Sequence, residues 1–459
     1  MVLAVVAVVF ACLFVAAVFR PGTCIAPIIV GYGFEQWTMA NSAFFAQQAQ
    51  LINFLVGGVV LVAFIASIAH HGNPFAINTA TFWGFLLLYL YSGLSCLWAP
   101  KVMETSVFVY QYYMPYTVCF GMMAPFCIRT KDDMRAALIA TLIFGGVTMI
   151  LLLVGTEIHS WGRTIVVAEG STMQNRVGKS TNRLAPLAVA ELAASVGLIA
   201  MLMNYRGATR VFALLRWPIL LMAFALILRS GSRGQLLACV VAGGACIGLA
   251  RGYKKELQVF VGATFVILTG LAAIVMFAMF STTGEERWTA SGMAEDFEGT
   301  RGHFCATLLL AWINAGPTAW LIGLGSSASF DILQIYPHVV MVEVLAELGF
   351  LGLGMYLGWL TLIGIAIYQA IKVSFKEPED RGMLAAVIAL FLLMFLLTFK
   401  QGSFQMQSTF FMICMMLARF SAILVQEHAK VERMRSLYMN QFYQWQNTAT
   451  AWLPTRDAT

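Results

Sequence analysis

Five ionisable side chains that could bind and react with a phosphate-bearing substrate lie near the ends of long apolar runs. Arg229 and Arg233 flank a short turn in the stretch LRSGSRGQLLA, and Arg183 and Arg301 each come shortly before another apolar run. Guanidinium groups bind phosphate oxygens through paired donors and keep their charge. His338 adds a group that can accept a proton from a hydroxyl near neutral pH. Arginines converging with this histidine at a membrane surface would form a pocket for a lipid-linked pyrophosphate.

The stretch around the histidine, Tyr336-Pro337-His338, predicts the start of a membrane helix. Proline suits the first position of a helix, so we expect His338 in the first turn, near the positive end of the helix dipole. That position disfavours the imidazolium form and suits a general base. An interfacial histidine bonded to a backbone group is the alternative. His303, close to Arg301 in the chain, and Tyr336 are candidates for a supporting role around the site.

A second interpretation of the arginines is structural. Long basic side chains near helix ends can extend to the lipid headgroups. This interpretation applies more readily to Arg229 than to Arg233 and Arg301. Each of those two precedes an apolar run and would lie at a helix N-terminus, which also favours anions.

The composition predicts an all-α polytopic membrane protein. Of the 459 residues, 60% are hydrophobic and 11% are charged, whereas soluble domains carry about 25% charged residues. Apolar runs near the roughly 20 residues that span a bilayer recur along the chain, and a barrel would show short alternating segments instead. The nine cysteines form no CxxC or Cys/His pattern, so no metal or cofactor site is expected. The net charge of +6 suits contact with anionic membrane lipids and gives no support for nucleic-acid binding.

About twelve transmembrane helices are expected within a single transmembrane domain, residues 1–459. They fall near 1–19, 51–70, 81–99, 104–128, 136–155, 185–204, 211–228, 235–250, 258–280, 338–370, 383–400 and 404–425. Loops rich in Lys and Arg alternate with loops that are poor in them. The positive-inside rule therefore places both termini in the cytoplasm, with a cytoplasmic tail at 426–459. Residues 20–50 and one long late loop, 281–337, are then expected in the periplasm. Within the first of these, the stretch CIAPIIVGYGF could form an extra hairpin, an interfacial segment or a loop.

Three features of the sequence together resemble the O-antigen ligase and O-antigen polymerase superfamily of bacterial membrane glycosyltransferases. The resemblance covers residues 180–420 approximately. Its features are Arg233 followed by Leu237 at the start of a span, Arg301 in the long loop, and His338 followed by Gly349 and Gly352. The family usually has Asn, Ser or Gln after the histidine, whereas this chain has Val339, which departs from the pattern of the ligase branch.

The resemblance implies an inner-membrane enzyme of lipopolysaccharide biosynthesis that transfers a glycan at the periplasmic face without a metal or a cofactor. The donor would be a glycan on undecaprenyl pyrophosphate, and the acceptor would be a sugar hydroxyl of lipid A-core. Polymerisation of O antigen or exopolysaccharide, with another lipid-linked glycan as acceptor, is the alternative within the superfamily. His338 would then take the hydroxyl proton, and the pyrophosphate ligands would be Arg233, Arg301, Arg183 and Arg229.

Two other functional classes fit the sequence less well. A metal-dependent membrane glycosyltransferase normally carries an acidic pair in its first outer loop, and residues 20–50 contain only Glu35. A transporter or flippase of lipid-linked glycans would favour internal repeats, and charges near the middle of broken helices. The charges of interest here fall at the ends of the predicted spans instead.

Overall fold

The structure, a computed structural model, describes residues 1–77, 80–155, 184–204, 210–253, 264, 302–374 and 377–451. These residues are helical apart from turns and contain no strand. The longer helices are α1 (Val2–Phe19), α2 (Ile25–Asn41), α4 (Gln50–His71), α5 (Ala80–Ser95), α6 (Val107–Tyr116), α7 (Lys131–Val154), α8 (Pro186–Leu202), α9 (Arg210–Arg229), α10 (Arg233–Arg251), α14 (Gly302–Asn314), α17 (Val340–Ser374), α18 (Pro378–Leu397) and α19 (Ser408–Ala451). The shorter ones are α3 (Ala43–Gln47), α15 (Pro317–Ile322) and α16 (Ala328–Leu333).

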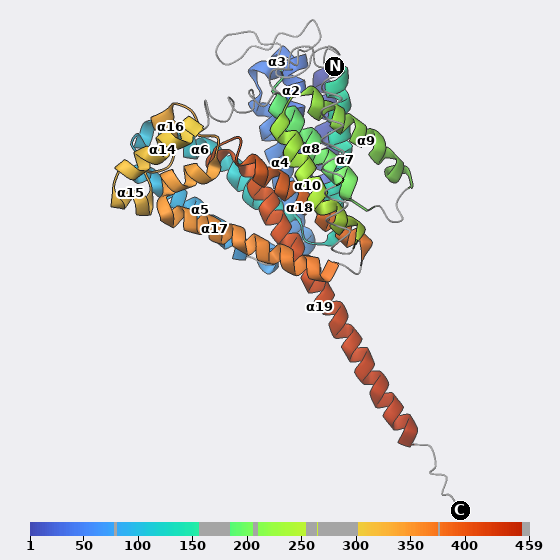
Figure 1. Ribbon diagram of the computed structural model, residues 1–459. Helices are drawn as coiled ribbons and strands as arrows, with labels where there is room; N and C mark the ends of the chain where they lie inside the picture. The colour runs from blue at the N-terminus through green and yellow to red at the C-terminus, as the bar shows by residue number, and fades with distance from the viewer. Residues whose placement is uncertain are drawn as a thin grey trace, which may run out of the picture.

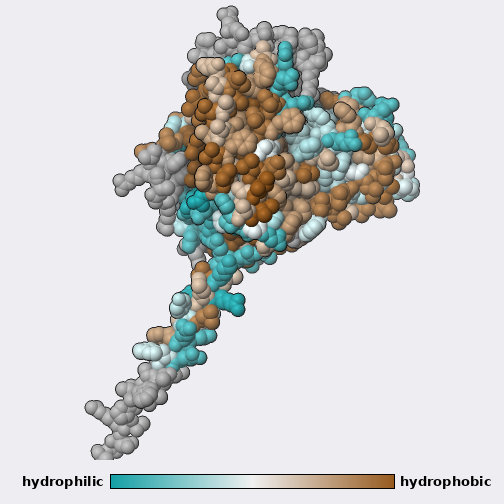
Figure 2. All heavy atoms as spheres, turned by 180° about the vertical axis from the view of Figure 1, so that it is seen from behind, coloured by the Kyte–Doolittle hydropathy of each residue, from teal (hydrophilic) through white to brown (hydrophobic). Residues whose placement is uncertain are grey.

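Eight of the described helices are long and apolar enough to cross a membrane, namely α1, α4, α5 with its extension to Trp98, α7, α10, α17, α18 and the first part of α19. Large apolar side chains face outward over the body of the molecule, and hydrophilic atoms gather where α19 leaves it (Figure 2). An apolar exterior of this extent needs lipid around it. The protein is therefore an all-helical polytopic membrane protein. The expected span at 258–280 lies, apart from residue 264, outside the described residues, as does the part of the expected 281–337 loop before Gly302. The described part of that loop contains α14, α15 and α16.

Basic residues from several connections gather at one end of the helix bundle, in agreement with the charge pattern of the sequence. We call this the basic end and define it by Arg129, Lys131, Arg135, Arg251 and Arg381. The other end holds the starts of α8, α10, α17 and α19, and we call it the pocket end.

Residues 20–50 do not lie outside the bundle, as the charge pattern predicted; most of them form α2 within it. After α1 the chain turns at Pro21–Cys24, where Gly22 packs against the backbone of Asp133 near the basic end. α2 then crosses the bundle, and Gln36 Oε1 accepts a hydrogen bond from Ala185 N (3.0 Å) at the start of α8. Neighbouring helices bury most of α2, including Gln36 and Thr38, two of the polar residues that lower its hydropathy. The N-terminus lies opposite the free end of α19 (Figure 1), and the prediction that both termini share one side is wrong.

α17 begins at Val340, not at Pro337 as the sequence predicted. His338 has a left-handed backbone conformation (φ 62°), so it precedes the helix instead of lying in its first turn. The reason is a tertiary contact, because Val340 N donates a hydrogen bond to Thr398 O (2.9 Å). This bond satisfies a donor at the helix start and fixes the approach of the chain.

The helices divide into a main bundle and a lateral group. α2, α4, α7, α8, α10 and α18 form the bundle, and α5, α14, α15, α16 and the first half of α17 lie to one side of it (Figure 1). α19 packs in the bundle through its first half and then continues away from the body, so the predicted tail from residue 426 is helical as far as Ala451.

Candidate functional site

The segment between α18 and α19, residues 398–407, contacts two parts of the chain that carry predicted site residues. On one side, Thr398 O accepts the hydrogen bond from Val340 N, two residues after His338. On the other side, Lys400 Nζ donates to Gln235 Oε1 at 2.7 Å, two residues after Arg233. The fold therefore brings the starts of α10 and α17 to the same short segment.

A chain of hydrogen bonds leads from Lys400 into the bundle. Gln235 Nε2 donates to Gln401 Oε1 at 2.7 Å, and Gln401 Nε2 donates to Glu191 Oε2 at 3.0 Å. Both amides are oriented the same way, with oxygen toward the ammonium group and nitrogen toward the carboxylate. Gly234 leaves room for the stem of Lys400, because a Cβ there would clash with it. Lys400 therefore packs against Gly234 and bonds Gln235, the two residues after Arg233. Lys400 was not among the site residues predicted from the sequence.

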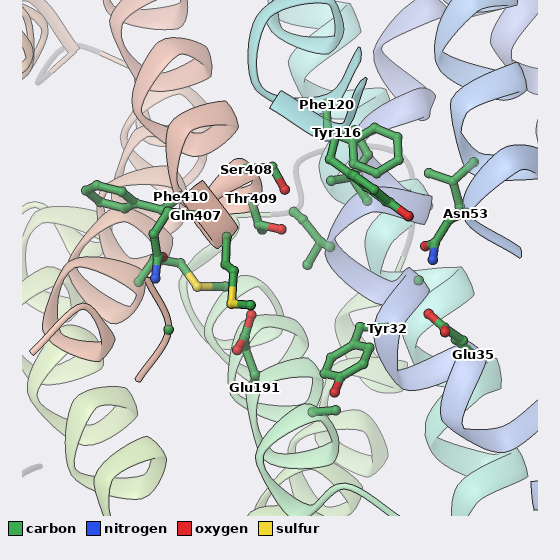
Figure 3. A pocket seen from close by; sticks show the side chains of 18 of the residues that line it. Tyr32, Glu35, Asn53, Tyr116, Phe120, Glu191, Gln407, Ser408, Thr409 and Phe410 are labelled. Atoms are coloured by element: carbon green, nitrogen blue, oxygen red, sulfur yellow. The ribbon is translucent and has the colours of Figure 1, made fainter. Parts of the chain in front are cut away.

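A pocket of about 520 Å³ lies where this series of hydrogen bonds ends, with Gln401 and Glu191 in its wall. Its walls come from α2, α4, α6, α8, the end of α18, the 398–407 segment and the start of α19. The polar lining residues are Tyr32, Glu35, Asn53, Tyr112, Tyr113, Tyr116, Glu191, Gln401, Gln407, Ser408 and Thr409. In Figure 3, Glu35 and Asn53 face each other on one wall, Glu191 lies across from them, and Tyr32 lies between.

An apolar groove of about 550 Å³ adjoins the pocket between α4 and α6. The two spaces share Asn53, Tyr112, Tyr116 and Phe120, so a molecule could occupy both. Gly57 leaves the groove open on the surface of α4, since a Cβ at this position would meet no atom within 4 Å. The pocket end therefore offers a polar space and an apolar space side by side.

None of the predicted site residues that the structure describes lines the pocket. Arg183 and Arg301 lie outside the described residues, and the described ones are Arg229, Arg233, His303, Tyr336 and His338. Arg233 is the first residue of α10, as predicted, and Arg229 ends α9 with only 6% of its surface exposed. His303 is exposed at the start of α14, where its ring neighbours Phe304.

Tyr336 connects the segment of His338 with the pocket wall. Burial raises the pKa of its hydroxyl, the nearby carboxyls of Glu343 and Glu347 add to the increase, and a hydrogen bond with Tyr113 opposes it. Tyr113 lines the pocket. The phenol keeps its proton at neutral pH and can hold the chain before α17 against the pocket.

Two buried acids in α17 were not predicted from the sequence. Glu343 is 1% exposed and accepts a hydrogen bond from Phe404 N (3.0 Å). Glu347 is 4% exposed and accepts hydrogen bonds from Ser327 N (2.8 Å) and Ser329 N (3.0 Å). Each carboxyl satisfies backbone donors at the start of a short helical turn. Two acids spaced i, i+4 in an apolar run were the sequence signal that could have found them.

Gly349, one of the residues behind the family resemblance, has a packing role. Its backbone is left-handed (φ 68°) and kinks α17, and a Cβ there would clash with Leu321 O. The close approach allows Gly325 N to donate to Glu347 O at 2.9 Å. This glycine is explained by the crossing of two backbone segments, independently of any chemistry at His338.

Within the described residues, no group of three or more His, Cys, Asp or Glu side chains is placed to hold a metal ion. No model of a known protein family matches the chain, and a comparison with curated proteins finds no match. Fold and site alone therefore define the class, which is an all-helical polytopic membrane protein with a polar pocket and an apolar groove that adjoin at one end.

Proposed function

We propose that the protein is a membrane glycosyltransferase that moves a glycan from undecaprenyl pyrophosphate to a sugar hydroxyl of lipid A-core, as an O-antigen ligase does. One observation carries the proposal: the polar pocket and the apolar groove share a wall beside the segment that contacts the starts of α10 and α17. A lipid-linked glycan has a polar head and a long apolar chain, so it needs adjoining spaces of both kinds. Transfer to a second lipid-linked glycan, which is polymerisation, is the other form of the same chemistry.

Cationic side chains near the start of α10 suit the pyrophosphate. Arg233 begins the helix, the buried Arg229 ends the preceding one, and Lys400 lies 2.7 Å from Gln235 Oε1. In the proposed reaction the acceptor oxygen bonds to the anomeric carbon while the bond from that carbon to the phosphate oxygen breaks. The cations would stabilise the leaving pyrophosphate, and His338 would receive the proton of the acceptor hydroxyl.

Purified protein in lipid nanodiscs allows a direct test, with undecaprenyl-pyrophosphate-linked glycan and lipid A-core as substrates and EDTA present. We expect glycan on lipid A-core and one released undecaprenyl pyrophosphate per transfer. Longer lipid-linked glycan without a lipid A-core product would identify the polymerase form. Proteoliposomes that carry the donor across the membrane without forming a new glycosidic bond would overturn the proposal in favour of a transporter.

A further inference from the structure

The charge of the pocket is opposite to the charge of the region around α10. Glu35 and Glu191 line the pocket, and the lining residues that the structure describes include no Lys, Arg or His. An anion such as a pyrophosphate would therefore be repelled from the pocket and attracted to Arg233 and Lys400 nearby. The two regions suit two different parts of one substrate.

The polar side chains of the pocket are those that recognise hydroxylated rings. Tyr32, Tyr112, Tyr113 and Tyr116 contribute aromatic rings, whose apolar faces can cover the C–H face of a sugar while their hydroxyls bond outward. Carboxylate, amide and hydroxyl oxygens around them can accept hydrogen bonds from sugar hydroxyls. The volume of about 520 Å³ lies within the range of about 300–1,000 Å³ that is typical of small-molecule sites.

The hydrogen bonds that lead from Lys400 to Glu191 hold the Glu191 carboxyl group in place. Because Gln401 Nε2 donates to Glu191 Oε2, the carboxyl is held as an acceptor and its position in the wall is set. The ammonium group of Lys400 polarises the intervening amides in the direction that favours a negative charge on Glu191. The hydrogen-bond chain thus places a carboxyl oxygen of Glu191 in the pocket wall as an acceptor.

We infer that the pocket binds a neutral sugar or an amino sugar and rejects sugars that carry a carboxylate. The inference deepens the proposed function and rests on it, since the bound sugar would be the one next to the reacting bond of a lipid-linked glycan. Glu35 and Glu191 bond hydroxyl or ammonium groups and repel an acidic sugar, whereas the tyrosines set the plane of the ring. Discrimination through unfavourable charge contacts is an efficient source of specificity.

Saturation-transfer NMR on the full-length protein in nanodiscs of neutral phospholipid tests the inference at mildly alkaline pH. The probes are methyl glucoside, glucosamine and glucuronate, which share one ring and differ in charge. We expect saturation of the first two and at least about tenfold weaker binding of glucuronate. The double variant Glu35→Gln/Glu191→Gln should bring glucuronate close to methyl glucoside, and Tyr32→Ala should weaken all three. Glu432→Gln, which removes a carboxylate on the extended part of α19, is the matched control and should change nothing.

Equal binding of glucuronate and methyl glucoside by the unaltered protein would overturn the inference, as would the absence of saturation for every probe. Unchanged discrimination in the double variant would do the same. If that variant does not fold, Glu35→Gln alone must reduce the difference between the probes. The binding readout separates this inference from the proposed function. If the protein discriminates between the probes but transfers no glycan, the inferred sugar site is supported and the proposed enzymatic function is overturned. If it transfers glycan but does not discriminate, only the inferred sugar site is overturned.

Discussion

The two ends of the helix bundle use charged side chains in different ways. At the basic end, charges are neutralised by direct partners: Lys131 Nζ lies 2.7 Å from Asp380 and 2.8 Å from Glu427, and Arg135 pairs with Glu379. At the pocket end, two amide side chains connect Lys400 with Glu191, and Glu191 borders an open pocket.

Arg419, also at the basic end, is held by backbone carbonyl oxygens and an aromatic ring. Its guanidinium group is buried, donates to the carbonyl oxygens of Ile128, Pro74 and Ile77 at 3.3 Å, and lies 4.7 Å from the centre of the Phe126 ring. The arginine joins two connections, the one between α4 and α5 and the one before α7, and its donors are occupied by backbone oxygens. The comparison teaches that an ionisable residue in a membrane protein points to function only when its surroundings leave room for a substrate. Variants at the pocket end should lose activity, and variants at the basic end should lose stability.

The largest effect is expected at His338. Replacement by Asn should lower the transfer rate about 10²–10⁴-fold, because Asn cannot take the acceptor proton. Asn tolerates the left-handed backbone of this position, so folding should be kept. The measurement is the initial rate of transfer in nanodiscs together with the thermal midpoint. His338→Gly controls for backbone strain and should be as inactive, and near-normal turnover in the Asn variant would remove the general-base assignment.

The next effect concerns Arg233, for which α10 offers a matched control at its other end. Arg233→Ala should lower the rate about 10²–10³-fold, as the loss of one donor to a developing charge does. Arg233→Lys should also be impaired, because Lys lacks the paired donors of the guanidinium group. Arg251→Lys, the last residue of the same helix, should keep normal activity. Equal rates for Arg233→Lys and Arg251→Lys would show that Arg233 does not hold the pyrophosphate.

Arg419 should give the opposite result. Arg419→Ala leaves three carbonyl groups at the basic end without their donor, so we expect a loss of about 3 kcal/mol in the free energy of unfolding. The thermal midpoint and the folded yield report this loss, and the rate per folded molecule should stay normal. Arg433→Ala, on the exposed part of α19, is the control and should be neutral. A stable but inactive Arg419→Ala protein would contradict the division between the two ends.

The smallest effect is expected in the apolar groove. Gly57→Phe would place a ring at the groove, with room for its Cβ, and should raise KM for the lipid-linked donor roughly tenfold, equivalent to about 1.4 kcal/mol of lost apolar contact. Gly358→Phe in α17 is matched, since a Cβ there also meets no atom within 4 Å and the residue lies outside the groove. An unchanged KM in Gly57→Phe, or equal changes in the two variants, would exclude the groove as the site of the apolar chain.

The long apolar runs of the sequence were sufficient to predict the fold class and most of the described helices. α10 illustrates this, because the run that predicted a span at 235–250 forms a helix at Arg233–Arg251. Burial of an apolar run in lipid depends on composition and length, which are properties of the run itself. α2 could not be found in this way, since Gln36 and Thr38, which lower its hydropathy, are buried by other helices.

The sequence by itself determined that this is a helical membrane protein, and that basic residues of alternate loops share one end. It also singled out Arg233 at a helix start. Only the tertiary structure decided that His338 precedes α17, because a hydrogen bond to Thr398 sets that boundary. The pocket was equally beyond prediction, since Glu35, Glu191 and Gln401 come from distant segments. Hydropathy and helix-start signals act over a few residues, whereas a site made by packing depends on which helices meet, and that follows from the fit of all their surfaces together.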